Sequence, residues 1–287
     1  MNSGLTPSRQ RGKALKICVF TTNPKGIYSG GRYLSLILAY SLARAGAEVT
    51  YVTNNLPVFD ADFAEYDRVT HLNKVVGPDM SPPEDLDADW VIVIPTGSFE
   101  DEFYNAALDA ARKWRSRVAL LSFETPNWFT QVSPYARSSL PSQSWRLVVA
   151  QGGAVITIAD AGIAPARRFY GEDRKDLFFD YWHPPINDLT AADVRVEPDG
   201  QKRVTCFVRV EDAHKGAADL LRIDPQVLAG HTLALIFGRG INTEYVDALS
   251  RHFADTPGFA IELHDLISDR EKFELLARSD LLLFPSY

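Results

Sequence analysis

The stretch 15-LKICVFTTNPKGIYSGGRYLSLILAYSLARAGAEVTYVT-53 has the pattern of a strand, a helix and a second strand. It opens with an apolar run rich in β-branched residues, which is typical of a strand buried on both faces. From about Arg32 the apolar residues recur with helical spacing, and Gly46 stands where such a helix would end. The stretch therefore predicts a βαβ unit of a parallel sheet. The helix is expected to turn one apolar face to the core, formed by Leu34, Ile37, Leu38, Leu42 and Ala45.

The same alternation of buried strands and amphipathic helices continues through both halves of the chain. In the first half the later elements are strands over 90–95, 117–123 and 154–158 and a helix over 102–114. In the second half the strands are 203–210, 232–238, 259–264 and 281–285, with helices beginning near Lys215, Asn242 and Ser268. We therefore expect an α/β protein with two Rossmann-like domains, each built on a parallel sheet.

A change of composition marks the expected link between the two domains. The segment 183-HPPINDLTAADVRVEPDGQK-202 has three prolines and little apolar periodicity, which is typical of a linker. We place an N-terminal domain at 13–185, a link at 186–202 and a C-terminal domain at 203–287. A parallel strand is normally followed by a covering helix, so the C-terminal domain is expected to be incomplete and the chain cut short.

Composition and charge exclude several classes of protein. Of the 287 residues 46% are apolar and 23% charged, as in ordinary globular domains, and the formal net charge of −7 gives no general attraction to nucleic acid. Apolar runs such as 90-WVIVI-94 are too short for a membrane span or a signal peptide. We expect a cytoplasmic protein, with peripheral membrane contact left open. Cys18 and Cys206 lie in strand-like runs and are expected to be buried, structural thiols.

In each half of the chain, a loop with candidate binding residues follows the first strand. The first, 23-NPKGIYSGGRY-33, leads into a helix N-terminus, where glycine and free N–H groups favour an anion. Its glycines do not have the spacing of a dinucleotide fingerprint or of a P-loop, so a simple tight turn is an equal alternative. The second, 206-CFVRVEDAHKG-216, places Arg209 and Lys215 beyond a strand as a diphosphate clamp. The alternative is a solvated loop in which Arg209 pairs with an acidic neighbour.

Four segments in order carry a family likeness. They are 30-GGRYLSLILAYSLARAGAEVTYVT-53, 208-VRVEDAHKG-216, 237-FGRG-240 and 276-LARSDLLLFPSY-287. Together they resemble the retaining nucleotide-sugar glycosyltransferases of GT-B architecture, in which two Rossmann-like domains face each other. In these enzymes the donor lies in the cleft, mostly on the second domain.

The resemblance implies roles for particular residues. Arg209 and Lys215, with Gly216, would neutralise the diphosphate of the donor, and Gly30 and Gly31 would approach the phosphates or the acceptor. The nucleotide would lie near Gly238, His264, Asp265 and Leu266, and the acceptor side would include Glu124 and Asn127. No cofactor and no metal are expected, since basic side chains would take the place of a divalent ion. His264 and the other histidines have no metal-binding spacing and are more simply explained as polar loop or strand-end residues.

Two departures from the family pattern qualify this interpretation. Val208 stands where the family has glycine before the clamp arginine. The family's pair of glutamates would fall beyond Tyr287, so the chain as given is expected to bind donor weakly and turn over poorly. No catalytic residue is assigned.

The leading hypothesis is sugar transfer, with retention, from a nucleoside diphosphate sugar to a saccharide or glycolipid hydroxyl in polysaccharide or glycolipid assembly. A second hypothesis is a non-catalytic relative that binds nucleotide and acts as an interaction module. A third is a nucleotide-sugar epimerase, which would consume donor without an acceptor.

Overall fold

The computed structural model describes residues 13–27, 30–94, 101–123, 149, 151–172, 174–184, 194–197, 199–211 and 215–285. The chain divides into two compact units. The first is drawn from Met1–Asn23, Leu34–Leu56 and Glu65–Pro185, and the second from Pro24–Tyr33, Pro57–Ala64 and Ile186–Tyr287. Of the predicted link at 186–202, residues 186–193 and 198 lie outside the described residues, and the link stays a prediction.

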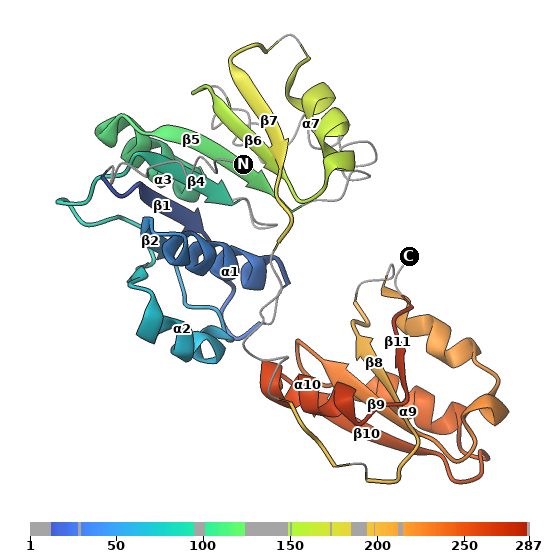
Figure 1. Cartoon of the computed structure of the whole chain (residues 1–287). Coiled ribbons are helices and arrows are strands. Elements are labelled where there is room, and N and C mark those ends of the chain that lie inside the picture. The colour runs from blue at the N-terminus through green and yellow to red at the C-terminus, as the bar shows by residue number, and fades with distance from the viewer. Residues whose placement is uncertain are drawn as a thin grey trace, which may run out of the picture. The chain divides into compact units, whose positions relative to one another are not determined.

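The first unit is built on a seven-stranded sheet in the order β3-β2-β1-β4-β5-β6-β7, with every pair parallel (Figure 1). Its strands are β1 (Lys16–Thr21), β2 (Glu48–Thr53), β3 (Asn73–Val76), β4 (Trp90–Ile94), β5 (Arg117–Ser122), β6 (Gly153–Thr157) and β7 (Leu177–Tyr181). In the register, Cys18 of β1 lies opposite Thr50 of β2 on one side and Val91 of β4 on the other.

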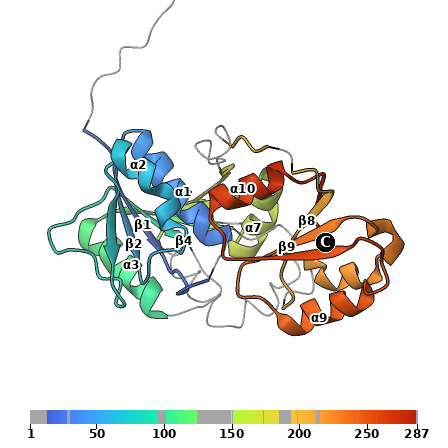
Figure 2. The ribbon, with the colours of Figure 1, turned by 90° about the horizontal axis from the view of Figure 1, so that it is seen from below.

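Helices cover both faces of this sheet. They are α1 (Gly30–Arg44), α2 (Ala64–Val69), α3 (Asp101–Trp114) and α7 (Ile163–Tyr170), with the short 3₁₀ turn η2 (Asp160–Gly162). The 3₁₀ turn η1 (Asp60–Phe63) belongs to the segment Pro57–Ala64 of the second unit. Cys18 and Phe20 pack in one cluster with Ala107 of α3. Figure 2 shows α1 on the opposite face of the sheet from α3.

Helix α1 is more deeply buried than the single apolar face that the sequence predicted. It begins at Gly30, two residues before the expected start, and Leu36, Ala39 and Tyr40 are buried in addition to Ile37 and Leu38. Of the other three predicted core residues, Leu34 and Leu42 are half-buried, and Ala45 is exposed beyond the end of the helix. The helix stop at Gly46 is confirmed, because its φ of 95° is left-handed.

The second unit has a four-stranded parallel sheet in the order β10-β9-β8-β11. Its elements are β8 (Arg203–Val208), η4 (Ala217–Arg222), η5 (Pro225–Leu228), β9 (Thr232–Phe237), α9 (Thr243–His252), β10 (Ala260–Asp265), α10 (Asp269–Ala277) and β11 (Leu281–Leu283). Leu235 and Phe237 of β9 join the apolar cluster under α9, whereas Ala234 and Ile236 join the one under α10. Alternate residues of the central strand therefore face different helices, and Figure 2 shows α9 and α10 on opposite faces.

The fold class expected from the sequence is confirmed, since both sheets are parallel and covered by helices. Helices α9 and α10 begin where predicted: Asn242 and Ser268 each cap the following helix with a side-chain oxygen. The helix expected near Lys215 is instead the 3₁₀ segment η4, preceded by Gly216 in left-handed conformation. The prediction missed α2, α7, β3 and β7.

Both cysteines are buried free thiols, as predicted. Burial raises the pKa of Cys206 to about 12 and that of Cys18 above its usual range, so both stay protonated at neutral pH. None of the helices in the described part of the chain has the length and apolar character needed to cross a membrane.

Candidate functional site

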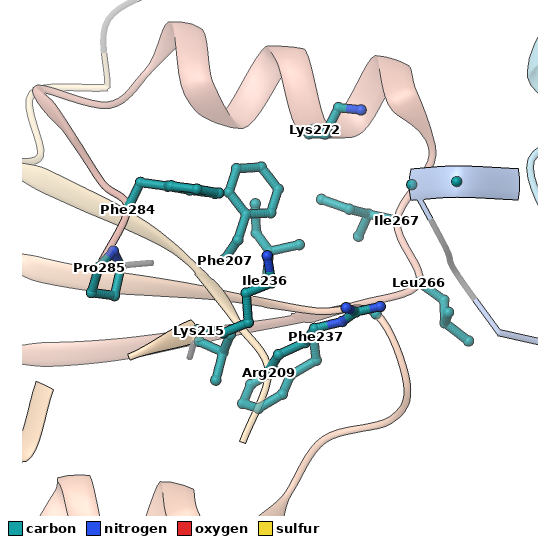
Figure 3. A pocket seen from close by; sticks show the side chains of 14 residues that line it. Phe207, Arg209, Lys215, Ile236, Phe237, Leu266, Ile267, Lys272, Phe284 and Pro285 are labelled. Carbon is teal, nitrogen blue, oxygen red and sulfur yellow. The ribbon is translucent and has the colours of Figure 1, made fainter. Parts of the chain in front are cut away.

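A cavity lies at the carboxyl edge of the second sheet, where ligands bind in open parallel sheets. Its walls come from the ends of β8 and β9, from the segment before η4, from the β10–α10 loop and α10, and from the segment after β11 (Figure 3). Residues of these elements that line it are Phe207, Val208, Arg209, Lys215, Ile236, Phe237, Gly238, Leu266, Ile267, Lys272, Phe284 and Pro285. The described lining residues include three cations and no carboxylate.

Arg209 and Lys215, predicted as a diphosphate clamp, both line this cavity. Arg209 directly follows β8 and Lys215 precedes η4, and both residues line the cavity at the same sheet edge. Figure 3 shows both side chains extending to the cavity from below α10. The structure therefore brings the two predicted cations together, while their role toward a ligand stays a prediction.

Gly216 fixes the position of the segment that carries Lys215. Its φ of 65° lies in the left-handed region, and a Cβ atom there would stand 2.3 Å from the carbonyl oxygen of Pro285. Only glycine allows this approach of the two backbones. Close by, the Tyr245 hydroxyl donates a buried 2.6 Å hydrogen bond to the carbonyl oxygen of Ala217, which ties η4 to α9.

Val208 is accommodated without filling the cavity. Although it borders the cavity, its side chain is buried in the apolar cluster under α9. The bulk that departs from the family's glycine is therefore directed largely into the core.

The four residues predicted near the nucleotide separate into two pairs. Gly238 and Leu266 line the cavity, and Leu266 is held in left-handed conformation with φ of 49°. His264 and Asp265 are not among the lining residues: His264 Nε2 lies 3.0 Å from Glu262 Oε1, and Asp265 Oδ1 accepts a 3.0 Å hydrogen bond from Gly240 N. In this structure Asp265 therefore braces the loop after β9.

Four other predicted positions are placed as follows. Gly30 and Gly31 form the first turn of α1, and a Cβ atom at Gly30 would meet no atom within 4 Å. Glu124 and Asn127, predicted on the acceptor side, lie outside the described residues.

Lys272 of α10 is a lining residue that the sequence interpretation missed. It forms an ion pair with the buried carboxylate of Asp269, three residues earlier on the helix. An acid and a lysine three residues apart are common on helix surfaces, so the spacing gave no sign of a cavity residue.

Among the side chains that the structure describes, no three histidine, cysteine or acidic groups cluster as metal ligands. The predicted absence of a metal stays a prediction.

Comparison with known proteins finds solved structures of similar architecture. No family model matches the sequence, and no curated protein is significantly similar to it. HepE of Anabaena in complex with UDP-glucose superposes with a TM-score of 0.60 at 12% identity, over 95% of this chain and 74% of HepE. WaaG, a glycosyltransferase involved in lipopolysaccharide biosynthesis, gives 0.56 at 14% identity over 95% and 75%.

The chain has the GT-B glycosyltransferase fold. A UDP-GlcNAc 2-epimerase from Neisseria meningitidis bound to UDP-GlcNAc is also similar, with a TM-score of 0.52 at 9% identity over 93% of this chain and 77% of the epimerase. The predicted resemblance to GT-B proteins is thus confirmed at the level of the fold. At these identities the likeness extends to the fold alone.

Proposed function

We propose that this protein binds a nucleoside diphosphate sugar through Arg209 and Lys215 and transfers the sugar to an acceptor hydroxyl. The observation that carries the proposal is the pair of cations at the carboxyl edge of a parallel sheet, both lining one cavity. The chemistry of the pair suits a diphosphate, because charge-assisted hydrogen bonds to phosphate oxygens are strong. The fold shared with HepE, which was solved with UDP-glucose, supports the same ligand class.

The two cations would act on the leaving group. As the glycosidic bond breaks, negative charge grows on the departing nucleoside diphosphate, and cations already in place stabilise this charge without reorganisation. Apolar neighbours such as Phe237 and Ile236 lower the local dielectric, which strengthens the interaction. We propose that the cations do this work without a divalent ion, so that transfer persists in EDTA.

The acceptor and the stereochemistry extend the proposal. We propose retention at the anomeric carbon and a saccharide or glycolipid acceptor, on the likeness of the motifs around Arg209, Gly238 and Pro285 to those of retaining enzymes. Proton NMR of the anomeric proton in the glycoside product would distinguish retention from inversion. A product with the anomeric configuration opposite to that of the donor would contradict retention.

Calorimetric titration of UDP, ADP and GDP and of their glucose derivatives tests the proposal. We expect at least one nucleoside diphosphate to bind, and Arg209→Met and Lys215→Met each to weaken it by about tenfold or more. Arg222→Met is the matched control, since Arg222 lies in the same unit but is 79% exposed and pairs with Asp219. If no diphosphate binds, or if both variants bind like the control, the proposal is wrong.

Epimerisation is the second candidate, favoured by the similarity to the UDP-GlcNAc 2-epimerase. An epimerase converts its nucleotide sugar without any acceptor, whereas a transferase needs one. Incubating the protein with the nucleotide sugar that binds, with and without a mixture of acceptor glycans, separates the two. Binding without turnover in either mixture would indicate the non-catalytic relative instead.

A further inference from the structure

Lys272 brings a third positive charge to the cavity, beyond those of Arg209 and Lys215. Figure 3 shows it on α10, with Phe207 and Ile267 between it and the other two cations. A ligand that reaches all three cations must therefore carry acceptor groups at two places, separated by a part that lies against apolar side chains.

A buried carboxylate holds the Lys272 ammonium in place. Asp269 begins α10, and its side chain is 1% exposed, whereas that of Lys272 is 25% exposed. The carboxylate end of the ion pair is thus buried and the ammonium end borders the cavity. Asp269 bonds Lys272 through Oδ1, while the structure describes no hydrogen-bond partner for its buried Oδ2. Among the described residues, the Asp269 side chain therefore hydrogen-bonds Lys272 and no second group.

The ammonium of Lys272 keeps donors for a ligand. An ammonium has three N–H donors, and among the described residues its hydrogen-bond acceptor is Asp269 Oδ1. The ammonium also lies 5.0 Å from the centre of the Phe273 ring, which stabilises a cation and accepts no strong hydrogen bond. The remaining donors can bind an anionic oxygen.

The remaining N–H donors of Lys272 indicate the ligand class. Arg209 and Lys215 match the two ionised phosphates of a nucleotide sugar, and no described lining residue supplies a carboxylate to accept hydrogen bonds from these donors on the cavity side. We propose, on the basis of the proposed function, that Lys272 binds an acidic group on the sugar, so that the preferred donor is a nucleoside diphosphate uronic acid and not a neutral sugar. Asp269 is the positioning residue that holds the ammonium at the cavity.

The test uses the protein as it exists with two ligands that differ only at carbon 6 of the sugar. These are the glucose and glucuronic acid derivatives of the nucleoside diphosphate that binds tightest, titrated by calorimetry. We expect the glucuronic acid derivative to bind about tenfold tighter or more. Lys272→Met should reduce this preference to less than about twofold, whereas Lys272→Arg should keep the preference.

Arg270→Met is the matched control. It removes one positive charge from the same helix, but Arg270 is 73% exposed, pairs with Glu274 and does not line the cavity. This variant should keep the full preference for the acidic sugar. Equal binding of the two sugars, or an equal loss of both in Lys272→Met, overturns the inference. Absence of binding by every nucleoside diphosphate would instead overturn the proposed function, so the two failures are distinguishable.

Discussion

Gly216 lies directly against Pro285, so closely that a Cβ atom on the glycine would stand 2.3 Å from the proline carbonyl oxygen. Gly216 directly follows Lys215, and Pro285 directly follows Phe284. Lys215, Phe284 and Pro285 all line the cavity. Two loops that are far apart in sequence therefore share one backbone contact. The position of Lys215 depends on the absence of a single methyl group.

Gly216→Ala should both destabilise the second unit and weaken nucleotide binding. Alanine pays about 1 kcal/mol for the left-handed backbone, and the clash with Pro285 adds about 1–3 kcal/mol or displaces the loop. Gly230→Ala is the control, since Gly230 has a φ of 69° but open space around its Cβ position. Gly230→Ala should therefore lose only the roughly 1 kcal/mol of the left-handed backbone. Urea unfolding followed by circular dichroism, with calorimetry for the ligand, measures both effects; equal results for the two variants would contradict the role of this contact.

Gly153→Ala should destabilise the first unit. Gly153 opens β6 with a φ of 141°, and a Cβ atom there would stand 2.0 Å from the carbonyl oxygen of Val118 on β5. We expect a loss of about 2–4 kcal/mol, because the strand pair must separate to admit the methyl group. Gly152→Ala is the neighbouring control: it is also left-handed, but its closest contact would be 3.8 Å.

Tryptophan fluorescence measures this effect selectively, since all five tryptophans lie at or before Trp182. The urea midpoint seen by fluorescence should fall further in Gly153→Ala than in Gly152→Ala. If the two variants unfold at the same urea concentration, the close approach of β5 and β6 does not destabilise the protein when residue 153 carries a Cβ atom.

Strand positions were predictable because buried parallel strands read as continuous apolar runs, as at β9 and β4. The strands that were missed are edge strands with partly exposed, mixed sequences: β3 reads NKVV and β7 reads LFFDY. They gain their conformation from pairing with β2 and β6, which is a tertiary effect that local pattern does not contain.

The site was predictable to the extent that it follows strand ends. Arg209 and Gly238 come directly after buried strands, so the parallel topology alone brings them to one edge. Lys272 belongs to a helix, where its direction depends on the rotation of α10 about its axis. Its neighbour Asp269 would have been expected at the surface, as a favourable first-turn acid, and it is instead fully buried.

Tyr245→Phe should lower the stability of the second unit without creating a cavity. The substitution removes the hydroxyl that donates to the carbonyl oxygen of Ala217 and leaves that buried acceptor without this partner. The expected cost is about 1–3 kcal/mol in urea unfolding followed by circular dichroism. The fluorescence midpoint of the first unit should not change. An unchanged circular dichroism midpoint would show that water replaces the lost hydroxyl.

The capping box of α10 should make the second unit sensitive to acid. Glu271 accepts hydrogen bonds of 2.8 Å from the backbone N–H and from the hydroxyl of Ser268, and these bonds hold the pKa of Glu271 below its ordinary value of 4.5. The folded protein therefore binds this proton less readily than the unfolded chain. The stabilisation is complete above the ordinary pKa and is lost as the pH falls through the lowered one.

Glu271→Gln should flatten this part of the pH dependence. Urea midpoints of the second unit, measured by circular dichroism between about pH 3 and pH 6, should fall less steeply with acid in the variant than in the native protein. Glu274→Gln removes an acid from the same helix that pairs with Arg270 and caps nothing, so it should retain the native slope. Ser268→Ala should lower stability by about 1 kcal/mol at neutral pH and also flatten the acid limb, because it removes a hydroxyl that favours the ionised carboxylate. Identical slopes in the native protein and in Glu271→Gln would mean that other carboxylates govern the acid unfolding of this unit.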